Sequence, residues 1–140
     1  MRGCLTLAGQ AFDEDEVPIG AMVVLAGEKI IGKGYNQTEK LRDVTAHAEM
    51  LALTAASEYL GSKYLHDCII YVSVEPCPMC AAALSWAQIS TVVYGTADPK
   101  KGYSNYSPLL LHPKTVIRSG VLAEECGELV RKFFRGKRIS

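Results

Sequence analysis

Two short segments of the chain carry side chains that are able to hold a metal ion. Residues 45–49 contain His47, and residues 75–80 contain Cys77 and Cys80. One imidazole and two thiolates are donors that a tetrahedral zinc ion accepts, and three protein ligands leave its fourth position to water. A zinc ion with an open position acts in catalysis, so these residues predict a hydrolytic zinc site rather than a structural one.

An acidic side chain near the histidine is suited to moving protons in such a reaction. Glu49 lies two residues after His47, and a glutamate beside zinc-bound water can act first as general base and then as general acid. Residues two positions apart in a helix point to different faces. We therefore expect the helix to meet the metal with its N-terminal end, because side chains of the first turn lean in that direction.

The two cysteines have alternative interpretations. A Cys-x-x-Cys pair that follows a buried strand and opens a helix is also typical of thioredoxin-like redox proteins. On its own this motif leaves redox chemistry and metal binding equally open, and His47 with Glu49 favours zinc. Two rival hypotheses stay open: a thiol oxidoreductase, in which Cys77 and Cys80 cycle between dithiol and disulfide, and a zinc-binding scaffold without catalysis.

Alternating strands and helices must position these residues. Runs rich in valine and isoleucine predict strands at 17–25 and 29–35 with a hairpin turn at 26–28, and later strands at 69–74, 91–94 and 115–117. Helices are expected at 4–16, with Met1 almost inside a shortened start, from Thr45 as cap to Gly61, at 78–86, and from Leu122 onward. Because helices separate the later strands, we expect parallel pairing there.

The composition limits the class of protein. The chain has 140 residues, 49% apolar and 21% charged, which suits one folded domain over residues 1–140 and excludes a disordered chain. Fifteen basic and fifteen acidic residues cancel, so any contact with nucleic acid must come from a local patch. No apolar run is long enough to cross a bilayer, and five cysteines, an odd number, favour reducing surroundings. We therefore expect a cytoplasmic protein without membrane contact.

The chain resembles a known enzyme family. Its His-x-Glu segment followed by Pro-Cys-x-x-Cys resembles the signature of the zinc-dependent nucleobase deaminases. Residues 15–21, 34–36, 94–95 with 98–100, and 120–138 are similar to the bacterial tRNA-specific adenosine deaminases, so the resemblance covers nearly the whole chain. Residues 102–108 depart from the pattern, because relatives usually carry small residues and serine there.

The resemblance implies a fold, a reaction and several residue roles. The fold is α/β, a cytidine-deaminase-like three-layer α/β/α sandwich with a mixed five-stranded sheet. The reaction is hydrolysis of adenosine to inosine at the wobble position of a tRNA anticodon stem-loop, by hydroxide on one Zn²⁺ per chain, in a homodimer. Asn36 would bind the flipped base, Asp98 would lie near the neighbouring sugar-phosphate, and Glu75 would act just outside the metal ligands.

Other substrates stay open at this point. The same metal site serves deaminases of a free base or nucleoside such as guanine, cytosine or cytidine, and the neutral net charge gives RNA no special support. Basic residues near the end of the last expected helix suit RNA phosphates, although they also complement the helix dipole. These residues are Arg131, Lys132, Arg135, Lys137 and Arg138.

Overall fold

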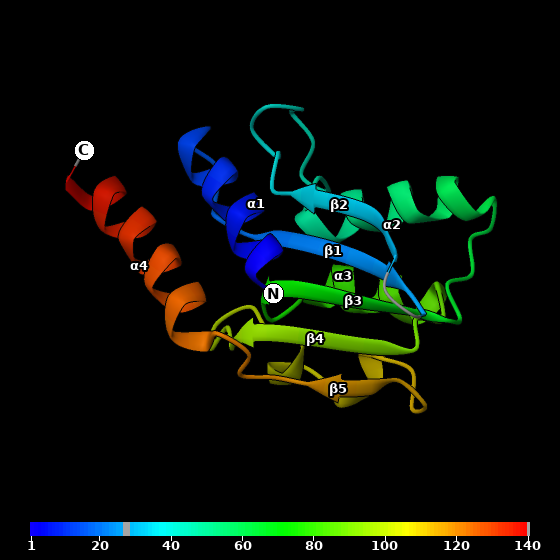
Figure 1. Cartoon of the computed structure of the whole chain (residues 1–140). Helices are drawn as coiled ribbons and strands as arrows, with labels where there is room; N and C mark the ends of the chain where they lie inside the picture. Colours follow the sequence, from blue (N-terminus) through cyan, green and yellow to red (C-terminus); the bar gives the residue numbers. More distant parts are fainter. Residues whose placement is uncertain (27–28, 140) are drawn as a thin grey trace.

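One mixed sheet forms the centre of the computed structural model, which describes residues 1–26 and 29–139 (Figure 1). Its strands are β1 (Gly20–Leu25), β2 (Lys29–Tyr35), β3 (Cys68–Val74), β4 (Thr91–Thr96) and β5 (Val116–Arg118), in the spatial order β2-β1-β3-β4-β5. β1 is antiparallel to β2 and β3, whereas β4 is parallel to β3 and β5. The hairpin pairing and the parallel pairing are thus confirmed, and the predicted turn residues 27–28 lie outside the described residues.

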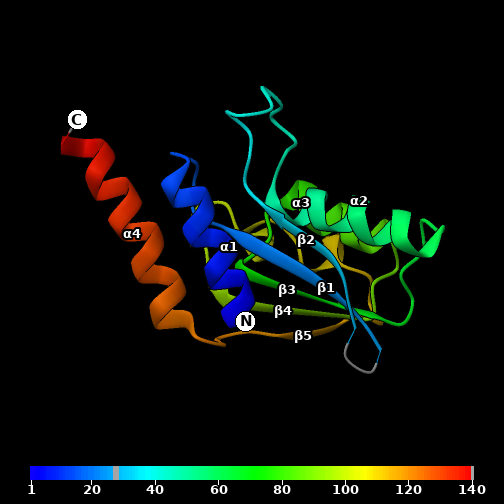
Figure 2. The ribbon, with the colours of Figure 1, turned by 45° about the horizontal axis from the view of Figure 1, so that its top comes forward.

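Helices cover both faces of the sheet, which confirms the three-layer α/β/α sandwich. The described residues contain α1 (Arg2–Asp13), α2 (Ala48–Leu60), α3 (Pro78–Trp86) and α4 (Ala123–Ile139), and the short 3-10 turns η1 (Tyr103–Asn105) and η2 (Pro108–Leu110). α1 and α4 lie side by side on one face, and α2 and α3 lie on the other (Figures 1 and 2). The rings of Phe12 and Phe133 join α1 to α4, edge to face, with 5.9 Å between their centroids.

Two expected helix boundaries are wrong. α1 begins at Arg2 and ends at Asp13, not at residue 16, so the chain leaves the helix within the acidic stretch that precedes Pro18. α2 begins at Ala48 with His47 as its N-cap, and Thr45 does not cap it. The N–H and the hydroxyl of Thr45 instead donate to Asp43 Oδ1, at 2.8 and 2.7 Å, which places Thr45 in a turn before the helix. The other end of α2 is confirmed, since Gly61 follows it with a left-handed φ of 64°.

Two glycines of β2 allow α2 to lie very close to the sheet. A Cβ atom on Gly34 would collide with the carbonyl oxygen of Ala48, and one on Gly32 would collide with that of Ala52. Any side chain at either position would therefore push the helix away. This close approach fixes where α2 begins relative to the end of β2.

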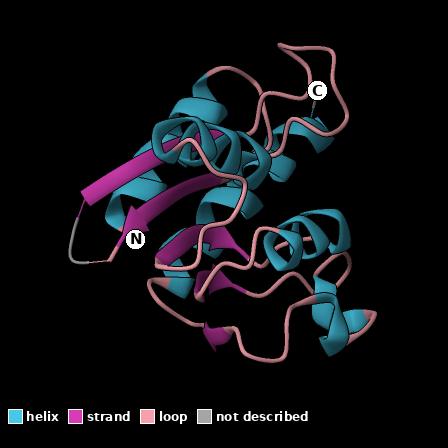
Figure 3. Ribbon diagram, turned by 90° about the vertical axis from the view of Figure 1, so that its right-hand side faces the viewer, coloured by secondary structure: helices cyan, strands magenta, loops and turns pink. Residues whose placement is uncertain are grey.

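Three strands deliver their carboxyl ends to one edge of the sheet. β2 and β3 are both antiparallel to β1, and β4 is parallel to β3, so β2, β3 and β4 run in the same direction. The residues that follow them include Asn36, Glu75 and Asp98. The loop of residues 37–46, which leads from β2 to α2, projects from the body in every view (Figures 1, 2 and 3). Loops at such an edge are common locations for ligand sites in α/β proteins.

The largest part of the core lies between the sheet and the layer of α2 and α3. Its buried members include Val23, Ile70, Val72, Leu84 and Val92. Because side chains of the sheet and of both helices pack tightly in this core, they hold the N-terminal ends of α2 and α3 in fixed positions. Within residues 1–26 and 29–139, no helix combines the length and apolarity needed to span a membrane.

Candidate metal centre

His47 stands at the junction between the loop of residues 37–46 and α2. Its backbone is extended, with φ −76° and ψ 154°, and its side chain makes no capping hydrogen bond. The N–H of Ala48 instead donates to Asn36 Oδ1 at 2.9 Å. An asparagine at the end of β2 therefore satisfies the helix terminus, and the half-buried imidazole of His47 is left for another partner.

The two cysteines lie where the chain turns from β3 into α3. Cys77 is the N-cap of α3, Pro78 occupies the first helical position, and Cys80 lies in the first turn. Proline suits that position because it lacks the N–H that would be unsatisfied there. Cys80 is fully buried and Cys77 is half-buried. Both sulfurs lie at the positive end of α3, which favours the thiolate form that binds metal.

The three predicted ligands come together in the structure. His47 Nδ1 lies 3.5 Å from the Sγ atom of Cys77 and 3.5 Å from that of Cys80, and all three atoms lie within 4.8 Å of one another. A tetrahedral zinc ion with Zn–N of about 2.05 Å and Zn–S of about 2.3 Å separates nitrogen from sulfur by about 3.6 Å. The residues present therefore fit a zinc ion with little adjustment, and they leave one of four positions open.

The contacts among His47, Cys77 and Cys80 shift the pKa values of all three side chains. A hydrogen bond from Cys80, assisted by one from His47, lowers the pKa of Cys77 to about 4. The hydrogen bond between Cys80 and Cys77 raises the pKa of Cys80, and burial raises it further. The hydrogen bond between His47 and Cys77 raises the pKa of His47. A divalent ion must displace the protons of Cys80 and His47, so metal affinity falls as the pH falls.

Glu49 lies in the first turn of α2 with its side chain buried. Burial raises the pKa of its carboxyl to about 7, and the neighbouring Cys77 and His47 act on it through their charges. Residues two positions apart in a helix point to different faces, but this does not separate His47 from Glu49. His47 precedes the helix, and only Glu49 has helical backbone. The structure thus brings the predicted proton carrier together with the three predicted ligands.

Asn36 lies at the end of β2 and is buried. Its Oδ1 atom is engaged by Ala48, whereas its amide NH₂ makes no hydrogen bond within the described part of the chain. An amide donor in such a place is available to a ligand.

Glu75 and Asp98 come together with each other rather than with the metal ligands. Glu75 Oε1 accepts from the N–H of Asp98 at 3.1 Å, and Oε2 accepts from the N–H and the hydroxyl of Ser104 at 3.0 and 2.6 Å. Asp98 Oδ1 accepts from the N–H groups of Lys100 and Lys101, each at 3.0 Å. The two carboxylates therefore shape the loop that follows β4, directly beside the turn that carries Cys77.

Three residues that act around the site were not identified from the sequence. Lys101 carries a positive charge that lowers the pKa of His47. Ser104 anchors Glu75, and Glu16 is a buried acid that accepts hydrogen bonds from residues 38–40. No local pattern identifies Lys101 or Ser104. The only signal for Glu16 was an acid placed directly before an apolar strand.

Known proteins share this fold and these motifs. Residues 1–96 match the family described as the cytidine and deoxycytidylate deaminase zinc-binding region. The tRNA-specific adenosine deaminase of Agrobacterium fabrum is 42% identical over 144 residues, which cover 99% of this chain and 94% of the relative.

Two solved structures extend the comparison. One comes from biochemical and structural studies of A-to-I editing by tRNA:A34 deaminases at the wobble position of transfer RNA; it has a TM-score of 0.83 and 40% identity, covering 90% of this chain and 94% of that one. The guanine deaminase of Bacillus subtilis has a TM-score of 0.65 and 40% identity, covering 69% of this chain and 61% of that one. These matches confirm the cytidine-deaminase-like fold, and the chain belongs to the zinc-binding cytidine and deoxycytidylate deaminase family.

Proposed function

We propose that this protein is a zinc-dependent hydrolase that converts adenosine to inosine at the wobble position of a tRNA anticodon stem-loop. The observation that carries the proposal is the cluster of His47, Cys77 and Cys80, whose ligand atoms lie within 4.8 Å of one another and which the buried Glu49 adjoins. The identity of 42% with a tRNA-specific adenosine deaminase supports adenosine as the base and tRNA as its carrier.

In the proposed reaction, adenosine and water give inosine and ammonia. When bound, zinc supplies the activation of the attacking water at the ring carbon that bears the amino group. Glu49 takes a proton from this water and delivers it to the adjacent ring nitrogen, and then carries a proton to the departing ammonia. The burial of Glu49 supports this role, because a buried carboxyl exchanges protons with its neighbours instead of with bulk solvent.

Three further residues hold the substrate and shape its site. Asn36 binds the flipped base through its amide NH₂, because its oxygen is already used by Ala48. Asp98 orders the turn through Lys100 and Lys101, and this turn meets the sugar-phosphate next to the reacting nucleotide. Glu75 supports the same turn from the side of the metal ligands.

The strongest alternative is deamination of a free base, with guanine as the first candidate. It is favoured by the 40% identity with the guanine deaminase of Bacillus subtilis. The basic residues of α4 also give less support to RNA than their number suggests. Arg131 and Arg135 both pair with Glu128, at 3.2 and 2.8 Å, and Lys137 pairs with Asp15 at 2.7 Å.

We also propose that the protein works as a homodimer in the cytoplasm. Trp86 at the end of α3 is 78% exposed, and Leu109 in the adjoining η2 is 81% exposed. Large exposed apolar side chains on adjoining elements are candidates for a protein interface. The free state of all five cysteines suits a reducing compartment. Light scattering should give a dimer for the wild type and mainly a monomer for Trp86→Asp; a wild-type monomer would contradict the dimer.

The substrate is tested by incubating the zinc-loaded protein with an anticodon stem-loop RNA that carries adenosine at the wobble position. We expect inosine at that position and one ammonia released per inosine formed. The matched control is the same RNA with guanosine at that position, which should release no ammonia. Free guanine, cytosine and cytidine are assayed in parallel. Activity confined to a free base or nucleoside, or no deamination of any substrate, would overturn the proposal.

A further inference from the structure

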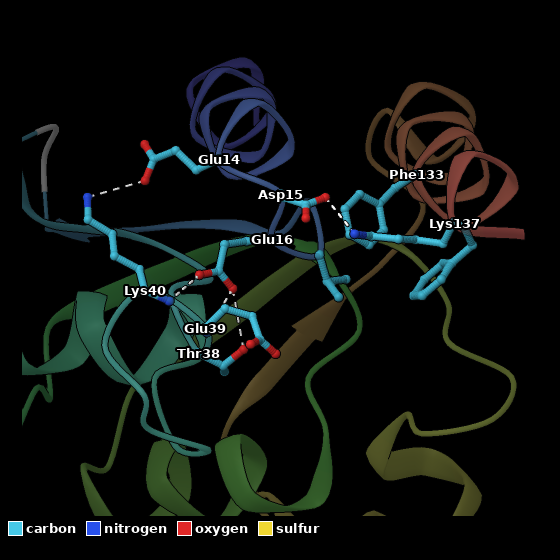
Figure 4. A pocket seen from close by; sticks show the side chains of 10 residues that line it. Glu14, Asp15, Glu16, Thr38, Glu39, Lys40, Phe133 and Lys137 are labelled. Atoms are coloured by element: carbon cyan, nitrogen blue, oxygen red, sulfur yellow. Dashed lines mark hydrogen bonds and ion pairs between the residues drawn. The ribbon is translucent and has the colours of Figure 1, made fainter. Parts of the chain in front are cut away.

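Glu16 is an acid that the structure buries almost completely, with 2% of its surface exposed. Its Oε1 accepts from the hydroxyl of Thr38 at 3.3 Å and from the N–H of Glu39 at 3.2 Å, and its Oε2 accepts from the N–H of Lys40 at 2.8 Å. Figure 4 shows this carboxylate pointing at these residues. Burying a carboxylate is costly unless donors surround it. All of the donors that surround Glu16 belong to one loop.

That loop, residues 37–46, joins two residues of the metal centre. Asn36 precedes it and His47 follows it, and its ends are tied together because Gln37 N–H donates to the Ala46 carbonyl at 3.0 Å. Residues 39–45 are all exposed, so they bury little apolar surface that would hold them in place. The shape of the loop therefore depends mainly on hydrogen bonds.

Packing from α4 does not replace these hydrogen bonds. A pocket of about 680 Å³ lies beside the loop, with Glu16, Thr38 and Lys40 on one side and Phe133 and Lys137 of α4 on the other (Figure 4). Lys40 also forms an ion pair with Glu14 at 3.2 Å. Both side chains are partly exposed, and such surface ion pairs contribute little to stability. Glu16 is thus the main link between the loop and the turn that connects α1 to β1.

We infer that Glu16 is a positioning residue for the deamination: by holding residues 38–40 it fixes the loop that joins Asn36 to His47, and with it the wall that the substrate passes to reach the metal. The inference rests on the proposed function. Glu16 itself touches neither the metal ligands nor the reacting ring. Its effect passes through the loop, so its loss should disturb the binding of a large substrate more than the metal site.

Three variants test this role. Glu16→Ala removes every acceptor, and Glu16→Gln keeps the size but offers one acceptor oxygen in place of two. Glu39→Gln is the matched control, because it removes the same charge from an exposed residue of the same loop. With the stem-loop RNA we expect kcat/KM to fall at least about tenfold for Glu16→Ala, mainly through a higher KM, and less for Glu16→Gln. Glu39→Gln should stay within about twofold of the wild type, and zinc content should be unchanged throughout.

The split between KM and kcat separates positioning from simple instability. A loss of folded protein lowers kcat and leaves KM unchanged, so that result in both Glu16 variants would overturn the inference. A second readout needs no activity: amide hydrogen exchange at residues 38–46 should be at least about tenfold faster in Glu16→Ala, with β3 still protected. Unchanged exchange would also overturn it. If the wild type deaminates none of the substrates, the proposed function fails, and the exchange experiment still decides whether Glu16 holds the loop.

Discussion

Asn36 and Ala48 are joined by a hydrogen bond of 2.9 Å, in which the first N–H of α2 donates to the side-chain oxygen at the end of β2. The side chain that usually accepts a capping hydrogen bond belongs to the residue directly before the helix, which here is His47. Because Asn36 caps the helix, the imidazole of His47 is free to bind metal. The two ends of one amide thus serve different purposes: the oxygen fixes the helix, and we propose that the NH₂ group binds the substrate.

Substitutions of Asn36 should separate these two purposes. Asn36→Asp keeps an acceptor for Ala48 and adds a negative charge at the helix N-terminus, so the free energy of unfolding should stay within about 1 kcal/mol of the wild type. It removes the NH₂ group, so kcat/KM should fall by about 100-fold or more. Asn36→Ala should lose activity and also about 1 kcal/mol of stability. Urea unfolding and steady-state kinetics measure both effects, and an active Asn36→Asp enzyme would exclude a role for the NH₂ group.

Glu49→Gln should remove catalysis without removing the metal. The glutamine keeps the size of the side chain but cannot accept and return a proton, so kcat should fall by about 10²- to 10⁴-fold. Elemental analysis should still find one zinc per chain. Glu58→Gln, at the exposed far end of the same helix, is the control and should keep full activity. An equal kcat in both variants would exclude Glu49 as the proton carrier.

Removal of zinc should lower the stability of the fold, and this effect should require all three ligands, His47, Cys77 and Cys80. A metal that binds only the folded chain raises the melting temperature, so a chelator should lower it and added zinc should restore it. Cys80→Ala should contain no zinc and should not respond to either treatment. Cys68→Ala removes another buried cysteine, outside the cluster, and should respond like the wild type. A wild type without zinc that reduces insulin would instead support the thiol oxidoreductase.

The metal ligands could be predicted from the sequence because each is encoded locally. Cys77 and Cys80 are placed by a strand, a turn and a proline at the start of a helix, and these signals lie within a few residues of one another. His47 lies with the two cysteines as expected, although the predicted start of its helix is wrong. Thr45 is a good capping residue in isolation, but Asp43 lies close enough to take both of its donors. Competition of this kind is common for threonine near helix ends.

Glu75 and Asp98 were expected near the site only from the family resemblance, and the contacts of the supporting residues could not be predicted where their partners are distant in the sequence. Glu16 meets a loop more than twenty positions later, and Glu75 meets Ser104 almost thirty positions later. These segments meet because of the spatial order of the strands in the sheet. The sequence predicts where strands lie along the chain more readily than it predicts their spatial order. Asp98 differs, because its carboxylate accepts from the N–H groups of its own turn, as an aspartate in a loop commonly does.

Gly102→Ala should disturb the loop that Glu75 organises. A Cβ atom at position 102 would collide with the carboxylate of Glu75, which is already held by Asp98 and Ser104. We expect a loss of about 1–3 kcal/mol in the free energy of unfolding and a lower kcat/KM. Gly9→Ala is the matched control, because a Cβ atom at this position in α1 meets nothing within 4 Å. It should gain roughly 0.5–1 kcal/mol from helix propensity, and a similar gain for Gly102→Ala would contradict the crowded contact.

The stability of the protein should fall in alkaline solution partly through Cys4. Burial raises the pKa of this thiol from 9.0 to about 11, and its S–H group donates to the carbonyl of Tyr71 at 3.3 Å. Between these pH values the folded chain keeps the proton that the unfolded chain has lost. The free energy of unfolding should therefore be unaffected by Cys4 below pH 9 and should fall by on the order of 2–3 kcal/mol as the pH rises through 11.

Urea unfolding of the wild type and of Cys4→Ala, both with excess zinc, isolates this effect. Other groups that titrate at alkaline pH are present in both proteins, so the difference between the two curves reports on Cys4. We expect Cys4→Ala to start at a lower stability, because a buried sulfur is lost, and then to show a shallower decline above pH 9. Parallel curves would mean that the thiol ionises as readily in the folded chain as in the unfolded one, and they would contradict the prediction drawn from the burial of Cys4.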